Sequence, residues 1–152
     1  MILHRVATAA DLPFIQSGFQ RSYRKSFNAG PIDAASWPAI AHAQVVRWIE
    51  RPGTRAIVAY DQEHENVRAG FILVDLTTYE RPYVYYLYVP LAFRESKVAS
   101  GLFRAAGVHP MSGFDFQCCT PASRLLRAKI PNARFDPNLG KRDPKEPDAP
   151  DE

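Results

Sequence analysis

The segment from Tyr83 to Gly107 holds the residues whose types and spacing best suit binding chemistry. An apolar and aromatic run, Tyr83 to Val89, predicts a buried strand, which Pro90 should end because proline cannot donate to a sheet ladder. The polar turn Arg94-Glu95-Ser96-Lys97 follows. Helical spacing then connects Val98, Leu102 and Ala105 or Ala106, with Gly107 as the stop. A basic turn before a helix aims unpaired N–H groups at one point, which predicts an anion site.

A strand-turn-helix unit of this kind also occurs in α/β proteins as a purely structural element. The surrounding elements must therefore decide between the two interpretations. Those elements have to bring the turn, the strand and any proton-transfer residues to one place.

The size and composition of the chain suit one soluble globular domain. Of its 152 residues, 46% are apolar and 23% are charged, and a chain of this length buries roughly two-thirds of its unfolded surface. No apolar run approaches the ~20 residues needed to span a bilayer. The first residues lack a basic head followed by an apolar signal core. We therefore expect a cytoplasmic protein that does not enter a membrane.

The cysteines and the charges argue against a metal site and against a dedicated nucleic-acid binder. Cys118 and Cys119 are adjacent, which gives no zinc-type spacing and predicts reduced strand residues.

The net charge is +3, but the last twelve residues hold three basic and five acidic side chains, which leaves +5 on the rest of the chain. A moderately basic body suits a phosphate-bearing partner without forming the dense basic stripe of a nucleic-acid binder.

The first half of the chain predicts a strand, two helices and two further strands. The periodicities and turn residues place them at Ile2–Ala7, at a helix capped by Asp11 and continuing to about Ser26, at a helix from Asp33 or Ser36 to Glu50, and at strands Thr54–Tyr60 and Val67–Leu76. Three strands joined by short polar turns, the third being Tyr83–Val89, imply an antiparallel meander.

The second half adds a strand at Gly113–Thr120, a helix at Pro121–Ile130 and a short last strand within Ala133–Leu139. The predicted order is β-α-α-β-β-β-α-β-α-β. This order predicts an α/β (α+β) fold with a mixed, mostly antiparallel sheet of five to seven strands flanked by about four helices. We expect one domain over residues 1–140 and a disordered, Pro-rich charged tail over 141–152.

This order, with an anion-binding turn between the fourth strand and the third helix, resembles the GCN5-related N-acetyltransferases over about residues 2–139. Leu87-Tyr88-Val89-Pro90 is similar to the end of the family's fourth strand. The family's Arg/Gln-x-x-Gly-x-Gly/Ala motif is matched at Arg94 and Ala99, whereas Lys97 replaces its first glycine. Glycine there allows a positive φ and a close approach to pyrophosphate; lysine loses that freedom and adds an ammonium group.

The resemblance implies a donor site for acetyl-CoA and direct transfer of the acyl group to an amine in a ternary complex. The pantetheine arm would lie between the fourth and fifth strands and pair with the backbone of Leu87, Tyr88 and Val89. The pyrophosphate would be held by the turn and the helix start, namely Arg94, Glu95, Ser96, Lys97, Val98, Ala99 and Ser100. The thioester would then lie near Tyr88 and the strand that carries Cys118.

Direct acyl transfer needs a neutral nucleophile, an oriented thioester and a proton donor for the departing thiolate. Family members often use a strand glutamate as base and a tyrosine of the last helix as acid, and the predicted last helix here has no tyrosine. Glu80 and Asp75 are the candidate bases, although solvated carboxylates in turns are common. The candidate acids are Tyr85, Tyr86, Tyr88 or a cysteine, and Tyr88 is chosen because the resemblance places the thioester near it.

Two classes of function remain open. The first is an N-acyltransferase whose acceptor is a small amine, a protein amine or a nucleobase amine. The second is a non-catalytic structural or interaction protein on the same fold. The missing glycine and tyrosine favour the second class, and the basic turn and aromatic strand favour the first. We expect acyl-CoA and an amine as partners, nucleic acid as a less favoured one, no metal, and a monomer or homodimer. The small size and charged tail also suit a phage protein.

Overall fold

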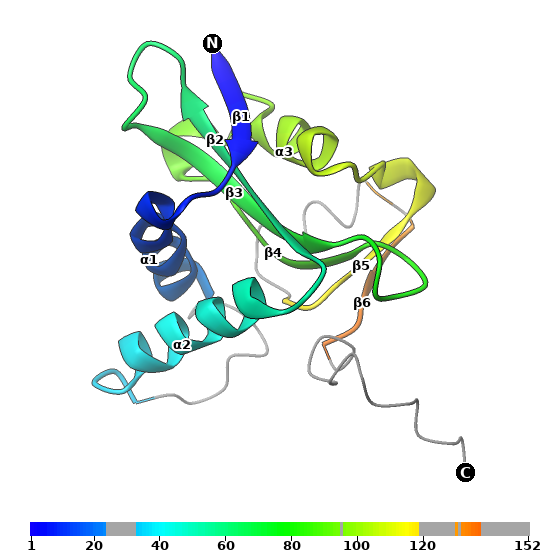
Figure 1. Cartoon of the computed structure of the whole chain (residues 1–152), viewed down its shortest axis with the longest axis horizontal. Helices are drawn as coiled ribbons and strands as arrows, with labels where there is room; N and C mark the ends of the chain where they lie inside the picture. The colour runs from blue at the N-terminus through cyan, green and yellow to red at the C-terminus, as the bar shows by residue number, and fades with distance from the viewer. Residues whose placement is uncertain (24–32, 95, 119–129, 131, 138–152) are drawn as a thin grey trace.

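A six-stranded mixed sheet with helices on both faces forms the molecule (Figure 1). The computed structural model describes residues 1–23, 33–94, 96–118, 130 and 132–137. The elements are β1 (Ile2–Val6), α1 (Leu12–Tyr23), α2 (Trp37–Glu50), β2 (Thr54–Asp61), β3 (Arg68–Asp75), β4 (Tyr83–Tyr88), α3 (Val98–Ala106), β5 (Phe114–Phe116) and β6 (Ala133–Phe135). None of the described helices has the length and apolar character that crossing a bilayer requires.

The strands lie in chain order, β1-β2-β3-β4-β5-β6. The strands β1 to β4 pair antiparallel, as the short polar turns between them predict. β5 then joins parallel to β4, and β6 joins parallel to β5. The predicted mixed, mostly antiparallel sheet is therefore confirmed. The predicted helix at residues 121–130 lies, apart from Ile130, outside the described residues, as does the tail 141–152.

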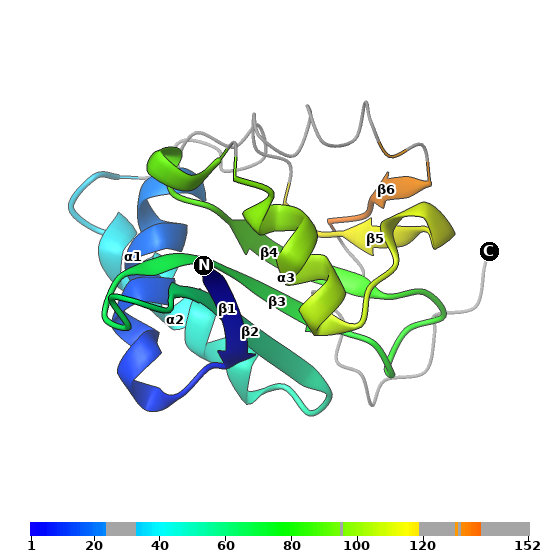
Figure 2. The ribbon, with the colours of Figure 1, turned by 90° about the horizontal axis from the view of Figure 1, so that it is seen from above.

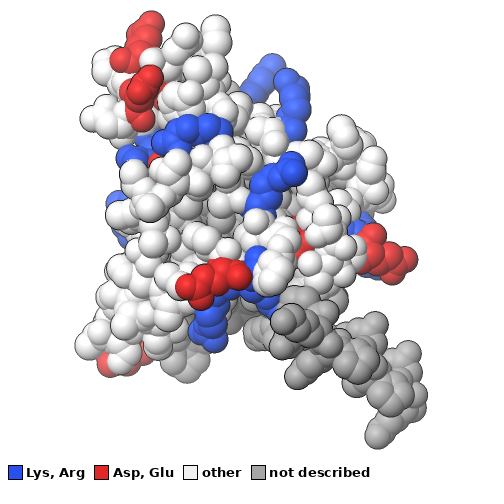
Figure 3. Space-filling model, in the orientation of Figure 1, with Lys and Arg blue, Asp and Glu red and all other residues white. Residues whose placement is uncertain are grey.

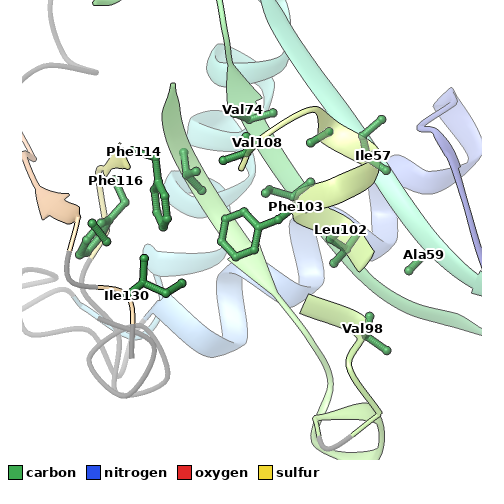
Figure 4. Close-up of a cluster of buried hydrophobic side chains, with 14 of the residues drawn as sticks. Ile57, Ala59, Val74, Val98, Leu102, Phe103, Val108, Phe114, Phe116 and Ile130 are labelled. Carbon is green, nitrogen blue, oxygen red and sulfur yellow. The ribbon is translucent and has the colours of Figure 1, made fainter. Parts of the chain in front are cut away.

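The two faces of the sheet bury different side chains. α3 packs on one face, where its Leu102 and Phe103 join a cluster of aliphatic residues and a few phenylalanines that includes Ile72 and Val74 of β3 (Figure 4). α1 and α2 cover the other face (Figure 2), where most of the large buried side chains are aromatic. β3 lies between both layers and is buried from Ala69 to Asp75. The aromatic layer also contains most of the side chains of β4.

Two predicted boundaries are wrong for local reasons. The strand expected at Gly113–Thr120 is much shorter, because β5 contains only Phe114 to Phe116 among the described residues. Gly113 has a φ of 96° and ends a short 3-10 turn instead of starting the strand. Asp11 does not cap the first helix: Thr8 is the N-cap, and Asp11 lies three residues later in a 3-10 turn that leads into α1.

The carboxylate of Asp11 joins three parts of the chain. It is fully buried and accepts hydrogen bonds from the Thr8 backbone N–H, from Arg5 of β1 and from Arg68 of β3. Burial alone would raise the pKa of Asp11, but the bonds from Arg5, Thr8 and Arg68 hold that pKa well below its ordinary value. The start of α1 is thereby fixed against two strands of the sheet.

We expect Asp11→Ala to lower the free energy of unfolding by about 3–5 kcal/mol, because it leaves two partly buried arginines without their counter-charge. Since the folded-state pKa of Asp11 is depressed, its contribution is complete above the unfolded pKa near 3.8 and is lost as the pH falls through the folded value. Urea unfolding at pH 7 measures the loss. The exposed Glu50→Gln is the control, and equal stability of the two variants would contradict the role of Asp11.

Candidate functional site

β4 loses its regular pairing at Tyr85. Tyr86 pairs with Leu73 of β3, but Val84 pairs with the next residue, Val74. Tyr85 is therefore the extra residue of a β-bulge, which bends a strand and increases its twist. Because of the bulge, the side chains of Tyr85 and Tyr86 both lie in the aromatic layer under α1 and α2, whereas a regular strand would alternate them.

The pairing of β4 with β5 stops just before the bulge. Tyr83 pairs with Asp115 and Val84 with Phe116, and the Gln117 N–H donates to the Val84 carbonyl at 3.0 Å. Within the described part of the chain, no strand pairs with this edge of β4 beyond Val84. Since β5 ends at Phe116, the second half of β4, where the resemblance places the pantetheine arm, has no partner strand on this edge among the described residues.

The turn after β4 leads into α3 through a left-handed residue. Lys97 has φ 60° and ψ 23°, and no other non-glycine residue in the described part of the chain has a positive φ. The position thus requires the conformation that a glycine adopts without strain. A lysine in this conformation costs roughly 1–2 kcal/mol.

The start of α3 leaves backbone donors unused. The Gly101 N–H donates to the Lys97 carbonyl at 3.1 Å, which closes the first turn of the helix. The N–H groups of Val98, Ala99 and Ser100 find no acceptor among the described residues, and no side chain caps the helix. Together with the positive end of the helix dipole, these donors form an anion-binding arrangement.

Two cationic side chains lie in the turn before this helix start. Arg94 and Lys97 are exposed there, and the described ion pairs involve other arginines. The Nε of Arg94 donates to the Val89 carbonyl at 3.0 Å, which holds the guanidinium at the end of β4. On the face shown in Figure 3, lysines and arginines lie in separate groups with acidic residues between them. This face therefore has no continuous basic stripe.

The other residues predicted to bind the donor differ in how far they are buried. Leu87 and Val89 pack partly against the layer under α3, and Val98 is buried within that layer. Ala99 is half-buried, whereas Ser96 and Ser100 are exposed. Glu95 and Cys119 lie outside the described residues. A group of three or more His, Cys, Asp or Glu side chains suitable for a metal ion is absent from the described residues.

Tyr88 ends β4 beside the turn. Its half-buried ring packs against Phe71 of β3 at 5.7 Å and Phe14 of α1 at 6.2 Å between centroids. A Cβ at Gly18 would lie only 2.7 Å from this ring, so α1 can approach β4 here only because residue 18 is glycine. The sequence signal for such a contact is a glycine in the middle of a predicted helix.

Asp75 is a buried carboxylate with a structural set of contacts. Its side chain accepts the backbone N–H groups of Thr77 and Thr78 at 2.9 and 2.8 Å, and the Thr78 hydroxyl at 2.6 Å. These bonds stabilise the turn between β3 and β4. An oxygen engaged in this way is poorly placed to take a proton from a substrate.

Glu80 and Tyr88 lie at opposite ends of β4. Glu80 is exposed on the connection before the strand, and Asp75 pairs with Tyr83 at the same end. Six extended residues cover about 17 Å from first to last. The structure therefore brings Tyr88 together with the anion-binding turn, but it does not bring either carboxylate to them.

Two polar residues that the sequence did not single out complete the aromatic layer. The Tyr86 hydroxyl lies 2.6 Å from the Ser22 Oγ, which itself donates to the Gly18 carbonyl, so Tyr86 is the donor to Ser22. The buried Gln117 accepts the Trp48 indole N–H at 3.1 Å. One bond joins β4 to α1 and the other joins the residue after β5 to α2, and neither leaves a sequence signal, because the partners are far apart in the chain.

No protein-family model and no curated protein matches the sequence. Solved structures do match the fold. A putative acetyltransferase from Pyrococcus furiosus aligns with a TM-score of 0.58 and 12% identity over 99% of this chain and 95% of that one. A predicted acetyltransferase from Clostridium acetobutylicum, solved with acetyl-CoA, gives 0.56 and 12% over 85% and 88%.

A third match is the PaiA N-acetyltransferase of Thermoplasma acidophilum in complex with coenzyme A, with a TM-score of 0.52 and 16% identity over 70% of each chain. At such low sequence identity, the match shows that the folds are similar and no more. This chain has the fold of the GCN5-related N-acetyltransferases, as its element order and its turn predict.

We expect Lys97→Gly to raise the free energy of unfolding by about 1 kcal/mol, because glycine adopts a positive φ without the clash of a Cβ. For a chain of this size that gain corresponds to about 2–4 °C in Tm. Thermal unfolding followed by circular dichroism measures it. Lys97→Gln is the control, since it removes the charge but keeps the strained backbone; a glycine variant no more stable than the glutamine variant would contradict the strain.

Proposed function

We propose that the protein is an N-acyltransferase that moves an acetyl group from acetyl-CoA to an amine. The observation that carries the proposal is an edge of β4 that has no partner strand beyond Val84 among the described residues and that leads into a turn and a helix start with unpaired N–H groups. An open strand edge suits the amides of a pantetheine arm, and a helix start suits a pyrophosphate. Structures of the same fold solved with coenzyme A and with acetyl-CoA support this assignment.

In the proposed donor complex, the pantetheine amides pair with the backbone of Leu87, Tyr88 and Val89. The Val89 carbonyl is occupied by Arg94 in the free protein. Pantetheine binding at that carbonyl would release the Arg94 guanidinium, which then lies close to the pyrophosphate. The N–H groups of Val98, Ala99 and Ser100 hold the pyrophosphate, with Ser96, Lys97 and the backbone of Glu95 beside it.

In the proposed reaction, the amine nitrogen attacks the thioester carbonyl carbon. A C–N bond forms, the C–S bond breaks, and the departing thiolate takes the proton of the Tyr88 hydroxyl, which the tyrosinate then regains from water. That hydroxyl makes no bond to a described residue, so its proton is available. The nitrogen loses its proton to water. Glu80 and Asp75 lie at the other end of β4 from Tyr88, and the oxygens of Asp75 are engaged by Thr77 and Thr78, so neither carboxylate is assigned as the base.

The competing proposal is a non-catalytic protein on the same fold. It is favoured by Lys97 in place of the motif glycine and by the distance of the carboxylates from Tyr88. A nucleobase acceptor gains no support from the face in Figure 3, where the basic groups are interrupted. CoA affinity separates the catalytic from the non-catalytic proposal.

Titration calorimetry with acetyl-CoA tests the donor site. We expect micromolar binding by the wild type and a loss of about tenfold or more in Arg94→Glu, because the reversed charge lies beside the pyrophosphate. Arg47→Glu makes the same charge change on the exposed face of α2 and should bind like the wild type. A folded wild type that does not bind acetyl-CoA would exclude the enzyme.

The role of Tyr88 is tested by Tyr88→Phe, which keeps the ring packing and removes only the hydroxyl. Loss of a general acid lowers kcat by about 10²-fold, while acetyl-CoA affinity and Tm should stay unchanged. Release of the CoA thiol over a panel of amines reports the rate. An undiminished kcat would assign Tyr88 to packing alone.

A further inference from the structure

The imidazole ring of His4, on β1, packs against the first turn of α3. A Cβ at Gly101 would lie only 2.6 Å from the His4 Nε2 and 2.8 Å from its Cε1, so the ring can lie this close to the helix only because residue 101 is glycine. The Gly101 N–H closes the first helical turn by donating to the Lys97 carbonyl at 3.1 Å. The His4 ring therefore supports the turn whose N–H groups form the anion-binding arrangement.

The Nε2 of His4 is buried and has no hydrogen-bond partner among the described residues. Buried polar atoms nearly always have a partner, so this exception needs an explanation. An unpaired nitrogen of the neutral ring costs one hydrogen bond. The N–H of an imidazolium in the same place would be an unpaired donor on a charged group, which costs more. The position therefore favours the neutral ring.

The charges on α3 also oppose protonation of His4. Burial, and after it the Arg104 guanidinium on α3, hold the pKa of His4 below its ordinary value of 6.5. The helix start beside the ring carries the positive end of the helix dipole. Lys97, at this end of the helix, adds a further cation, although its side chain is exposed.

β2, the strand that pairs with β1, supplies no counter-charge to His4. The residue of β2 opposite His4 is the uncharged Ala59. Arg55 binds the other end of α3, and the carboxylate of Asp61 accepts the Glu63 backbone N–H at 2.8 Å. None of the ion pairs among the described residues includes His4. An imidazolium in this place would thus be a charge without a counter-ion.

The ring of His4 has a way out of its position. β1 is the first strand of the sheet and, in the described part of the chain, pairs only with β2. His4 is half-buried, so its side chain already borders solvent. A rotation of the side chain toward solvent hydrates an imidazolium and leaves the first turn of α3 without its support.

We propose that His4 is a pH-sensitive support of the donor site: the neutral ring holds the first turn of α3, and uptake of a proton moves the ring away from Gly101 and weakens the binding of acetyl-CoA. The inference rests on the proposed acyltransferase function for its ligand, whereas the support itself exists without one. Donor binding and protonation of His4 therefore oppose each other. The displaced imidazolium lies in solvent, where salt screens its attraction for the pyrophosphate.

NMR titration of the ligand-free protein tests the support. Between about pH 8 and pH 5, the amide resonances of residues 98–101 should shift in the wild type with a midpoint below 6.5. His4→Phe keeps an aromatic ring beside Gly101 but cannot take up a proton, so its amides should not shift. His64→Phe, which changes an exposed histidine after β2, should behave like the wild type. Amides that stay constant in the wild type, or that shift equally in His4→Phe, would overturn the inference.

Calorimetry with acetyl-CoA tests the coupling to the donor. The phosphate monoester of acetyl-CoA titrates near pH 6 itself, at about the pKa of other phosphate monoesters, so the wild type is compared with His4→Phe, in which this contribution is the same. From about pH 7.5 to 5.5, the wild-type affinity should fall about three- to tenfold more than that of His4→Phe. Equal pH dependence in the two proteins would contradict the coupling.

Gly101→Ala displaces the ring without a proton, because the new Cβ occupies its place. At neutral pH this variant should bind acetyl-CoA about three- to tenfold more weakly than the wild type, with little further loss on acidification. Wild-type affinity in Gly101→Ala would show that the ring does not support the site.

The two titrations separate this inference from the proposed function. A wild type that does not bind acetyl-CoA refutes the acyltransferase, while the amide shifts still decide whether His4 supports α3. Acetyl-CoA binding with the same pH dependence in wild type and His4→Phe refutes the pH-sensitive support alone.

Discussion

β4 has one extra residue, Tyr85, and its pairing with β5 ends just before that residue, at Val84, while β4 stays paired with β3. Among the described residues, the second half of β4 therefore has a partner strand on one edge and none on the other. The bulge also places two consecutive tyrosines, Tyr85 and Tyr86, in the same layer. One of them is fixed by Ser22, and the other keeps its hydroxyl unpaired. The open edge of β4 and these two adjacent tyrosines thus lie at the same irregularity of the backbone.

The rest of the fold holds this irregular strand in place. Gly18 lets α1 lie directly on the ring of Tyr88, and the buried carboxylate of Asp11 fixes the start of α1 to β1 and β3. On the other face, α3 is seated by Leu102 and Phe103 (Figure 4). The helix begins directly after Lys97, whose backbone is left-handed. The helices on both faces are therefore fixed against the sheet that contains β4.

Much of the fold follows from local patterns in the sequence. Helical spacing and polar turns locate α1, α2, α3 and the antiparallel strands, and the replaced motif glycine identifies position 97 as one that needs a positive φ. The bulge was not predictable, because two tyrosines inside an aromatic run look the same in a regular strand. The roles of Asp11 and Asp75 were also missed, since their partners Arg68 and Thr78 are recognised only when the backbone has folded.

The parallel half of the sheet affects the order in which the chain can fold. β1 to β4 follow one another, apart from the two helices inserted after β1, so most of their pairings close short loops. β5 and β6 pair in parallel and need long crossovers, which form slowly. Until β5 docks, the edge of β4 from Tyr83 onward is an unpaired, aromatic strand, the kind that recruits other chains. Folding in the cell would therefore be most vulnerable to aggregation just before β5 docks on β4.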